Sequence, residues 1–416
     1  MNSSTTSSDS SAAPESAPKP ASRRLMSLDA LRGFDMFWII GADSLVQALR
    51  RMNDGWLVRG VASQLEHKDW AGFAFYDLIF PLFVFIVGVS LVFSLTKTME
   101  QAGKAAALQR VFRRSALLFA LAIVYSGGVS REWPDIRLMG VLNRIALCYF
   151  FAALIFCFFR WRGMLAICAA LLAGYWALMT FVPFPDVRPT PGGTQIIAKE
   201  TGFTNIAQLN MQSTNRIAGV FVKGVNLANY LDQQYLPGKK WDGTWDPEGL
   251  LSTLPAIGTC LLGVFAGLLL MNQSISDQQK VLYLIGGGMV AVGVGFLWGL
   301  QFPVIKKIWT SSYVLVAGGY SAILLGVFFL VVDVWKYQKW AQPFVWIGMN
   351  SITVYLANNI IDFDRFALRF VGGDVRNFFE ARLARGFGDF IIALAGLGLG
   401  VLLCYFLHRR RIFLRL

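Results

Sequence analysis

Five long stretches without a charged side chain constrain this chain more than any other feature. They contain no Asp, Glu, Lys or Arg, and they span residues 163–185, 249–276, 281–305, 308–332 and 340–361. A helix of roughly 20 apolar residues crosses a hydrocarbon core of about 30 Å, so each stretch is long enough to span a membrane. Because a spanning segment must satisfy its own backbone hydrogen bonds in lipid, we expect helices.

The composition indicates the same class of protein. Of the 416 residues, 55% are hydrophobic and only 15% are charged. The net charge of +13 comes from basic residues that flank the predicted helices, a pattern typical of contact with anionic lipid rather than with nucleic acid. We therefore predict an all-α, polytopic membrane helical bundle that lies in the lipid bilayer and binds no nucleic acid.

About ten transmembrane helices are predicted, with an external insert at residues 183–248 between the fifth and sixth. The predicted helices lie near residues 31–50, 74–95, 114–130, 138–159, 163–182, 249–271, 280–299, 312–332, 342–361 and 387–407. Lys and Arg concentrate in the N-terminal segment, in the loops after the second, fourth and eighth helices and in the C-terminal tail, although the opposite loops also carry some. This bias predicts that both termini are cytoplasmic.

The chain outside these helices has its own signals. Residues 1–22 are rich in Ser, Ala and Pro and are predicted to be disordered, and residues 23–416 form the membrane domain. The five cysteines lie inside apolar segments at no metal-ligand spacing, so we expect small buried hydrophobic residues and no metal. Glycines four residues apart, at 263 and 267 and at 295 and 299, indicate close helix packing and permit a homodimer.

His67 is the leading candidate for chemistry, because the chain has only two histidines and the other, His408, lies in the basic tail. Histidine gains or loses a proton near neutral pH. In the predicted topology His67 lies at the outer rim, at the depth of Asp43 and Asp77. The functional interpretation pairs His67 with Asp43, whose carboxylate would fix the imidazole tautomer. The alternative is that both carboxylates cap helices or pair with nearby basic residues.

Basic residues form a second candidate group. Arg144 lies inside the fourth predicted helix, where a buried guanidinium needs an anion, either a phosphate or an internal carboxylate. Arg24, Arg32 and Arg114 lie at the predicted inner rim, where they would hold the phosphates of a cytosolic cofactor. A solvated, lipid-facing position is the alternative for each of them.

A third group is acidic and aromatic and lies outside. Trp245, Asp246 and Glu248 occur within residues 241–249. Carboxylates beside tryptophan suit a polar sugar, especially one with an amine, and Asp77 is a further candidate for contact with such a substrate. The alternative for Asp246 is that it is the N-cap of a helix that begins with proline.

Several segments in order resemble the heparan-α-glucosaminide N-acetyltransferase family, in particular its bacterial NagX-type relatives. The resemblance runs from about residue 23 to the C-terminus and is carried by residues 24–33, 67–88, 140–144, 246–249, 309–313 and 348–351. It implies a membrane enzyme that takes acetyl from cytosolic acetyl-CoA and delivers it to a glucosamine amine on the periplasmic side of the bacterial inner membrane.

The same resemblance assigns roles to residues. The family's active histidine maps onto His67, and Asp43 replaces an Asn of the lysosomal enzyme. Asn350 and Ser351, in the last matching segment, are candidate acetyl-CoA contacts. His67 would either accept the acetyl group as a nucleophile or deprotonate the amine of the acceptor. An amino-sugar transporter and an O-acyltransferase of envelope glycans are the competing functions.

Overall fold

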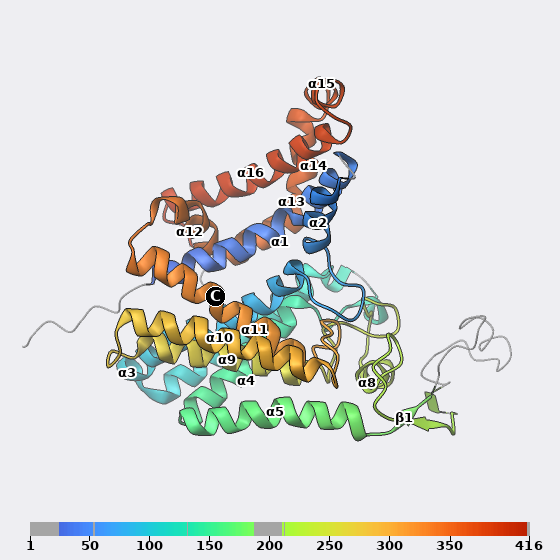
Figure 1. The fold of residues 1–416 in the computed structure, drawn as a ribbon, viewed down its shortest axis with the longest axis vertical. Helices are drawn as coiled ribbons and strands as arrows, with labels where there is room; N and C mark the ends of the chain where they lie inside the picture. The colour runs from blue at the N-terminus through green and yellow to red at the C-terminus, as the bar shows by residue number, and fades with distance from the viewer. Residues whose placement is uncertain (1–24, 53–54, 131, 187–209, 212, 414–416) are drawn as a thin grey trace, which may run out of the picture.

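The computed structural model describes residues 25–52, 55–130, 132–186, 210–211 and 213–413. Within these ranges the regular elements are helices apart from a two-stranded antiparallel pair, β1 (Phe184–Pro185) with β2 (Arg216–Ile217) (Figure 1). The helices, with short 3₁₀ and π turns labelled η, are α1 (Met26–Met52), α2 (Trp56–Gln64), α3 (Phe75–Tyr125), η1 (Gly128–Ser130), η2 (Trp133–Asp135), α4 (Val141–Phe158), α5 (Trp161–Phe181), α8 (Leu227–Tyr235), α9 (Thr253–Met271), α10 (Asp277–Gly299), α11 (Ser311–Phe328), η3 (Phe329–Val334), η4 (Lys339–Ala341), α12 (Gln342–Met349), α13 (Ser351–Ile361), α14 (Phe363–Val371), α15 (Asp374–Arg382) and α16 (Phe387–Arg409).

Seven helices in the described ranges are long and apolar enough to cross a membrane, and the bent pair α12–α13 raises the number to eight. They are α3, α4, α5, α9, α10, α11 extended by η3, and α16. The all-helical membrane class is therefore confirmed. The helix α1, which covers the first predicted span, is not among them, because charged side chains interrupt its apolar sequence.

Two details differ from the expected layout. The loop expected between residues 95 and 114 is helical except at Gly103 (φ 82°), where the two helical segments that make up the 51 residues of α3 meet at a kink. The span expected at 342–361 is instead two helices bent by 70° on either side of Asn350. In addition, α9 begins at Thr253 with Ser252 as its N-cap residue, so the alternative that Asp246 caps this helix is wrong.

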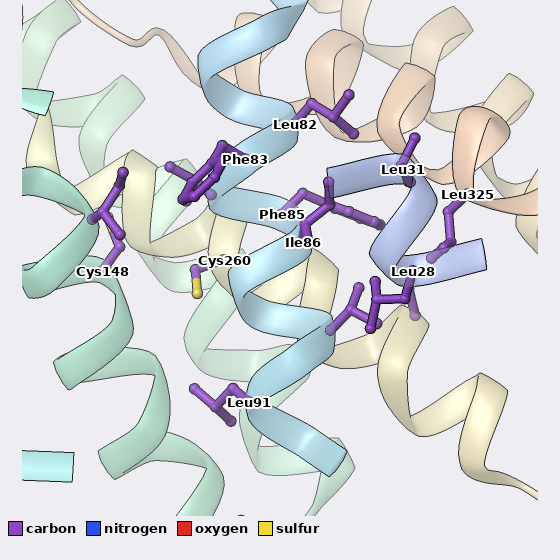
Figure 2. Close-up of a cluster of buried hydrophobic side chains, with 14 of the residues drawn as sticks. Leu28, Leu31, Leu82, Phe83, Phe85, Ile86, Leu91, Cys148, Cys260 and Leu325 are labelled. Carbon is purple, nitrogen blue, oxygen red and sulfur yellow. The ribbon is translucent and has the colours of Figure 1, made fainter. Parts of the chain in front are cut away.

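The core is built around α3, which passes between α4 and α9 on one side and α1 on the other. Figure 2 shows Cys148 of α4 on one side of α3 and Leu28 and Leu31 of α1 on the other, all of them buried. The contact between α3 and α9 leaves no room for a side chain at Gly88, because a Cβ there would lie 2.0 Å from the carbonyl oxygen of Cys260. Glycine is therefore needed for the backbones to approach this closely.

The predicted glycine pairs also pack inside the chain. A Cβ on Gly263 would lie 2.0 Å from the carbonyl oxygen of Phe85 in α3, and one on Gly295 would lie 2.8 Å from the backbone nitrogen of Val316 in α11. These contacts confirm the packing interpretation. Because they are made within one chain, the glycines give no support to a homodimer.

The two ends of the bundle differ. The helix α1 begins, and α16 ends, at the end opposite to the one that carries α8 and β1 (Figure 1). We call residues 213–248 the cap; they form most of the described part of the predicted insert and include the short helix α8. The loop that holds His67 lies beneath the cap, because Trp70 donates a hydrogen bond to the carbonyl of Phe221 and Lys223 pairs with Asp69. The predicted disorder of residues 1–22 concerns a segment outside the described residues.

Candidate active site

A short connection between α2 and α3 holds His67, and a second loop fixes that connection in place. Ala71 forms an antiparallel bridge with Ile305, and the backbone N–H of Gly72 donates to the carbonyl oxygen of Val304 at 2.9 Å. Gly72 has φ 121°, a conformation that L side chains rarely adopt. The loop between α10 and α11 is thus attached directly to the loop that carries His67.

Asp77, in the first turn of α3, is the carboxylate that meets His67. Its Oδ1 lies 2.9 Å from Nδ1 of His67, and its Oδ2 accepts hydrogen bonds from the backbone N–H groups of Lys68 and Ala74 at 3.3 and 3.1 Å. Tyr76 stacks on the imidazole, with ring centroids 4.5 Å apart. Asp77 is fully buried whereas the His67 side chain is 49% exposed, so a buried anion holds a ring whose other edge remains accessible.

These contacts change the role predicted for Asp77, whereas the predicted pairing of His67 with Asp43 stays a prediction. Asp77 was expected to contact substrate, but both of its oxygens are engaged by His67 and by the backbone. The predicted partner, Asp43, lies in α1, and its side chain is outside the described part of the structure. Asp77 is therefore the carboxylate that the structure places on His67.

Lys306 is a site residue that the sequence did not single out. Its Nζ lies 2.9 Å from Nδ1 and 3.2 Å from Nε2 of His67, and 3.7 Å from Oδ1 of Asp77. Only 19% of its side chain is exposed, and burial lowers the pKa of Lys306 to about 8 despite the neighbouring carboxylates of Asp77 and Glu248. One signal was visible in the sequence: Lys306 and Lys307 interrupt an otherwise uncharged stretch between two predicted helices.

Two cavities meet at these residues. The broader one, of about 660 Å³, is bounded by cap residues such as Lys239 and Trp241. The narrower one, of about 210 Å³, is mostly apolar and runs between α1, α3, α4 and α13. Six residues line both cavities: His67, Val141, Leu142, Glu248, Lys306 and Tyr355. A group bound in one cavity can therefore meet a group bound in the other beside His67.

Arg137 anchors the acidic residues predicted to bind substrate. It donates two hydrogen bonds to the carboxylate of Asp246, at 2.7 and 2.8 Å, and one to Glu248 at 2.7 Å. Asp246 is fully buried in this bidentate pair and does not line either cavity, whereas Glu248 lines both. Burial raises the pKa of Glu248 above its usual range. Asp246 thus fixes the segment before α9, and only Glu248 faces the cavities.

The tryptophan that faces the broad cavity is Trp241 rather than the predicted Trp245. Trp245 is 3% exposed and packs edge-on against Trp70, with ring centroids 5.8 Å apart. Trp241 lines the broad cavity and receives the guanidinium of Arg137 over its ring at 5.0 Å. Lys307, also in the lining, pairs with Asp242 at 2.8 Å.

The residues predicted to hold the cofactor are not gathered at either cavity. Arg144 is fully buried, donates to Ser252 and to the carbonyl of Gly249, and lies 4.9 Å from the ring of Trp309. Arg32 bonds to Ser90 in α3, Arg114 lies 4.8 Å from the ring of Tyr149, and Asn350 and Ser351 are buried at the bend between α12 and α13. Arg24 lies outside the described residues. The described residues contain no cluster of three His, Cys, Asp or Glu side chains that suits a metal ion.

Comparison with known proteins identifies relatives of this chain. The family described as "Heparan-alpha-glucosaminide N-acetyltransferase, catalytic" matches residues 24–197, which include His67, Asp77 and Arg137. The heparan-alpha-glucosaminide N-acetyltransferases of Mus musculus and Homo sapiens are both 28% identical to the chain. Each alignment covers 84% of this chain and, respectively, 56% and 55% of the relative, so the chain spans about half the length of these relatives. Residues 24–197 therefore match the catalytic family of heparan-alpha-glucosaminide N-acetyltransferase, and the chain is distantly similar to the mammalian proteins of that name.

Proposed function

We propose that this protein is an integral membrane acetyltransferase that moves acetyl from acetyl-CoA to the amine of a glucosamine-type sugar. The observation that carries the proposal is the position of His67. Its imidazole is oriented by a buried carboxylate and stands where an apolar cavity inside the bundle meets a polar cavity under the cap. A reaction between a slender acyl donor and a polar acceptor needs this arrangement of two binding sites and one basic group.

The narrow cavity suits the acyl-carrying arm of CoA. That arm is long, thin and uncharged, and most of the lining side chains are apolar. The carboxamide of Asn350 is buried with no hydrogen-bond partner among the described residues, and Ile352, two positions further, lines the cavity. We propose that Asn350 and Ser351 bond to the amides of the arm. Arg24, Arg32 and Arg114 remain the proposed phosphate ligands at the cytosolic surface, whereas Arg144 is committed to contacts inside the protein.

The broad cavity suits the sugar. Its volume of about 660 Å³ accommodates at least one hexose, and Trp241 offers an aromatic face beside polar groups. Glu248, at the junction of the two cavities, is the carboxylate we assign to the amine of the acceptor. Asp77, Asp246 and Trp245 do not contact the sugar in this proposal, because the first two are engaged by other groups and the third is buried against Trp70.

His67 performs the proton chemistry in either of two routes. With Nδ1–H donated to Asp77, Nε2 carries the lone pair of the ring; it lies 3.2 Å from Nζ of Lys306 and can accept a proton or attack a carbonyl carbon. As a base, His67 takes a proton from the sugar amine, which then attacks the thioester. As a nucleophile, it accepts the acetyl group first and passes it to the amine. Asp77 stabilises the positive charge that the ring acquires in both routes.

We also propose ten membrane crossings with both termini in the cytoplasm of a bacterium and with His67 on the periplasmic side. The helix α1 has 27 residues and α3 has 51, and a crossing needs roughly 20, so α1 supplies one crossing and α3 supplies two, divided near Gly103. The pair α12–α13 supplies one more. This topology places acetyl-CoA and the sugar on opposite sides, which accounts for a cavity inside the bundle.

The test is acetyl transfer by purified protein in detergent. Labelled acetyl-CoA is mixed with glucosamine, with glucosamine-ended oligosaccharides, or with no acceptor, and His67→Ala is the control. N-acetylated product from wild type alone supports the proposal. Acetyl found on oxygen would replace it with O-acyl transfer. Absence of product, together with counterflow of labelled amino sugar in proteoliposomes without acetyl-CoA, would replace it with transport.

A further inference from the structure

The reaction proposed above names no group that stabilises the departing sulfur of CoA, and Lys306 lies where such a group is needed. When the thioester breaks, the sulfur departs with a pair of electrons, and a thiolate in an apolar site needs a cation or a proton. Among the described residues that line the narrow cavity, Lys306 is the one ammonium. His67 lines it too, but carries positive charge only after it has taken up a proton. The remaining polar groups are the phenols of Tyr76 and Tyr355 and the carboxyl group of Glu248.

We propose that Lys306 is the acid that protonates the departing sulfur of CoA, and that His67 returns the proton to Lys306. The inference rests on the proposed function. In the direct route, the amine nitrogen bonds to the carbonyl carbon, the carbon–sulfur bond breaks and its electron pair goes to sulfur. Lys306 gives one proton to sulfur and becomes a neutral amine, while His67 takes one proton from the attacking nitrogen. Transfer of that proton from Nε2 to Nζ restores both residues and leaves the amide and free CoA.

The distance between His67 and Lys306 allows the proton to pass from the imidazole to the amine. Nζ of Lys306 lies 3.2 Å from Nε2 of His67, within reach of one proton hop, and the bridge between Ala71 and Ile305 holds the two loops together. The same relay serves the nucleophilic route. In that case Lys306 protonates sulfur when His67 is acetylated, and as a neutral amine it then accepts the proton of the attacking sugar amine.

The charges around Lys306 suit an acid of this kind. Asp77 and Glu248 favour its protonated form, Lys307 opposes it, and His67 exchanges a proton with it. Burial lowers the pKa of Lys306 to about 8 from the 10.5 of a free lysine. An ordinary thiol has a pKa of about 8.5, so acid and acceptor are closely matched and the transfer is nearly isoenergetic. An exposed lysine would be too weak an acid.

The first test compares leaving groups. Lys306→Met and Lys306→Arg are assayed with acetyl-CoA and with an acetyl thioester of an acidic aryl thiol, whose thiolate leaves without a proton. Lys97→Met, at an exposed position of α3 outside both cavities, is the matched control. We expect both Lys306 variants to lose about 10²–10³-fold in kcat with acetyl-CoA and less than about tenfold with the aryl thioester. Equal losses with the two donors would overturn the assignment.

The second test needs no turnover. Binding of CoA and of desulfo-CoA is measured by calorimetry at pH 8.5 for wild type, Lys306→Met and Lys306→Arg. Wild type and Lys306→Arg should prefer CoA by roughly tenfold, about 1.4 kcal/mol, because a cation faces the thiolate, whereas Lys306→Met should show no preference. The same preference in Lys306→Met and in wild type would overturn the role of Lys306 alone. Wild type that binds neither ligand would overturn the proposed function and this inference with it.

Discussion

The side chain of Asp77 lies 2.9 Å from the imidazole of His67, and the backbone carbonyl of Asp77 accepts a hydrogen bond from the buried hydroxyl of Tyr313 at 2.8 Å. The residue that orients the imidazole is thus itself held by a helix, α11, from the other half of the chain. Lys306 reaches the same imidazole from the loop that leads into α11. Movement of α11 would therefore disturb the carboxylate and the lysine together.

Replacing His67 with alanine should remove transfer and keep the fold. Because the side chain is half exposed, the substitution leaves no buried cavity, and the thermal midpoint should change by less than about 2 °C. The rate should fall by about 10³-fold or more, the order of a lost general base or nucleophile. Transfer is measured with labelled acetyl-CoA and stability by detergent-phase melting. Wild-type rates in this variant would remove His67 from the mechanism.

Asp77→Asn should lower turnover by about 10²–10⁴-fold with little effect on the affinity for acetyl-CoA. The carboxamide keeps the shape of the carboxylate but cannot stabilise a positively charged ring, and it allows the wrong tautomer. The measurement is kcat and KM across pH, with Asp43→Asn as the comparison. A larger loss in Asp43→Asn than in Asp77→Asn would restore the pairing predicted from the sequence.

Lys306→Met should be more stable than wild type near pH 7. Because burial lowers the pKa of Lys306 to about 8, its protonated form is less favourable in the folded state than in the unfolded one. This cost is present below pH 8 and fades between pH 8 and the ordinary lysine value of 10.5, so the variant should gain about 1–3 kcal/mol at pH 7 and nothing above pH 10.5. Thermal melting across pH measures the difference, and a less stable variant at pH 7 would contradict the prediction.

Arg137→Gln should destabilise the cap strongly. The substitution leaves the buried carboxylates of Asp246 and Glu248 without their shared cation, which typically costs about 3–5 kcal/mol. Burial already raises the pKa of Glu248, and loss of the guanidinium raises it further, so protonation at lower pH should relieve part of the cost. Unfolding is measured at pH 5 and pH 7.5 beside Arg59→Gln, which changes an exposed arginine of α2. A pH-independent loss would argue against this account.

Ile352→Trp should obstruct the narrow cavity. The larger ring occupies the volume that we assign to the arm of acetyl-CoA, so KM for acetyl-CoA should rise at least about tenfold, while binding of the sugar is retained. Ile360→Trp, at an 82% exposed position of the same helix α13, is the control. Unchanged affinity for acetyl-CoA in Ile352→Trp would place the donor elsewhere.

The sequence predicted the fold class and the positions of most helices from the lengths of its apolar stretches. The sequence did not predict where helices continue, kink or bend, because these features depend on how the helices pack against one another. The charges between residues 95 and 114 indicated a loop, but the chain is helical on both sides of a kink at Gly103, because charged side chains at a surface do not break a helix. Asn350 gave no sign of a 70° bend, because Asn is common in loops, caps and helices alike.

The residues of the candidate site were likewise predicted only in part. The sequence by itself determined a membrane protein of helices and singled out His67, because hydrophobic length is a local property and a histidine between apolar stretches is rare. Only the tertiary structure decided that Asp77 orients His67, that Lys306, 239 residues away, touches its ring, and that Arg137 takes up Asp246. Contacts at such separations depend on how α3, α11 and the loops at their ends pack, and no local pattern encodes that packing.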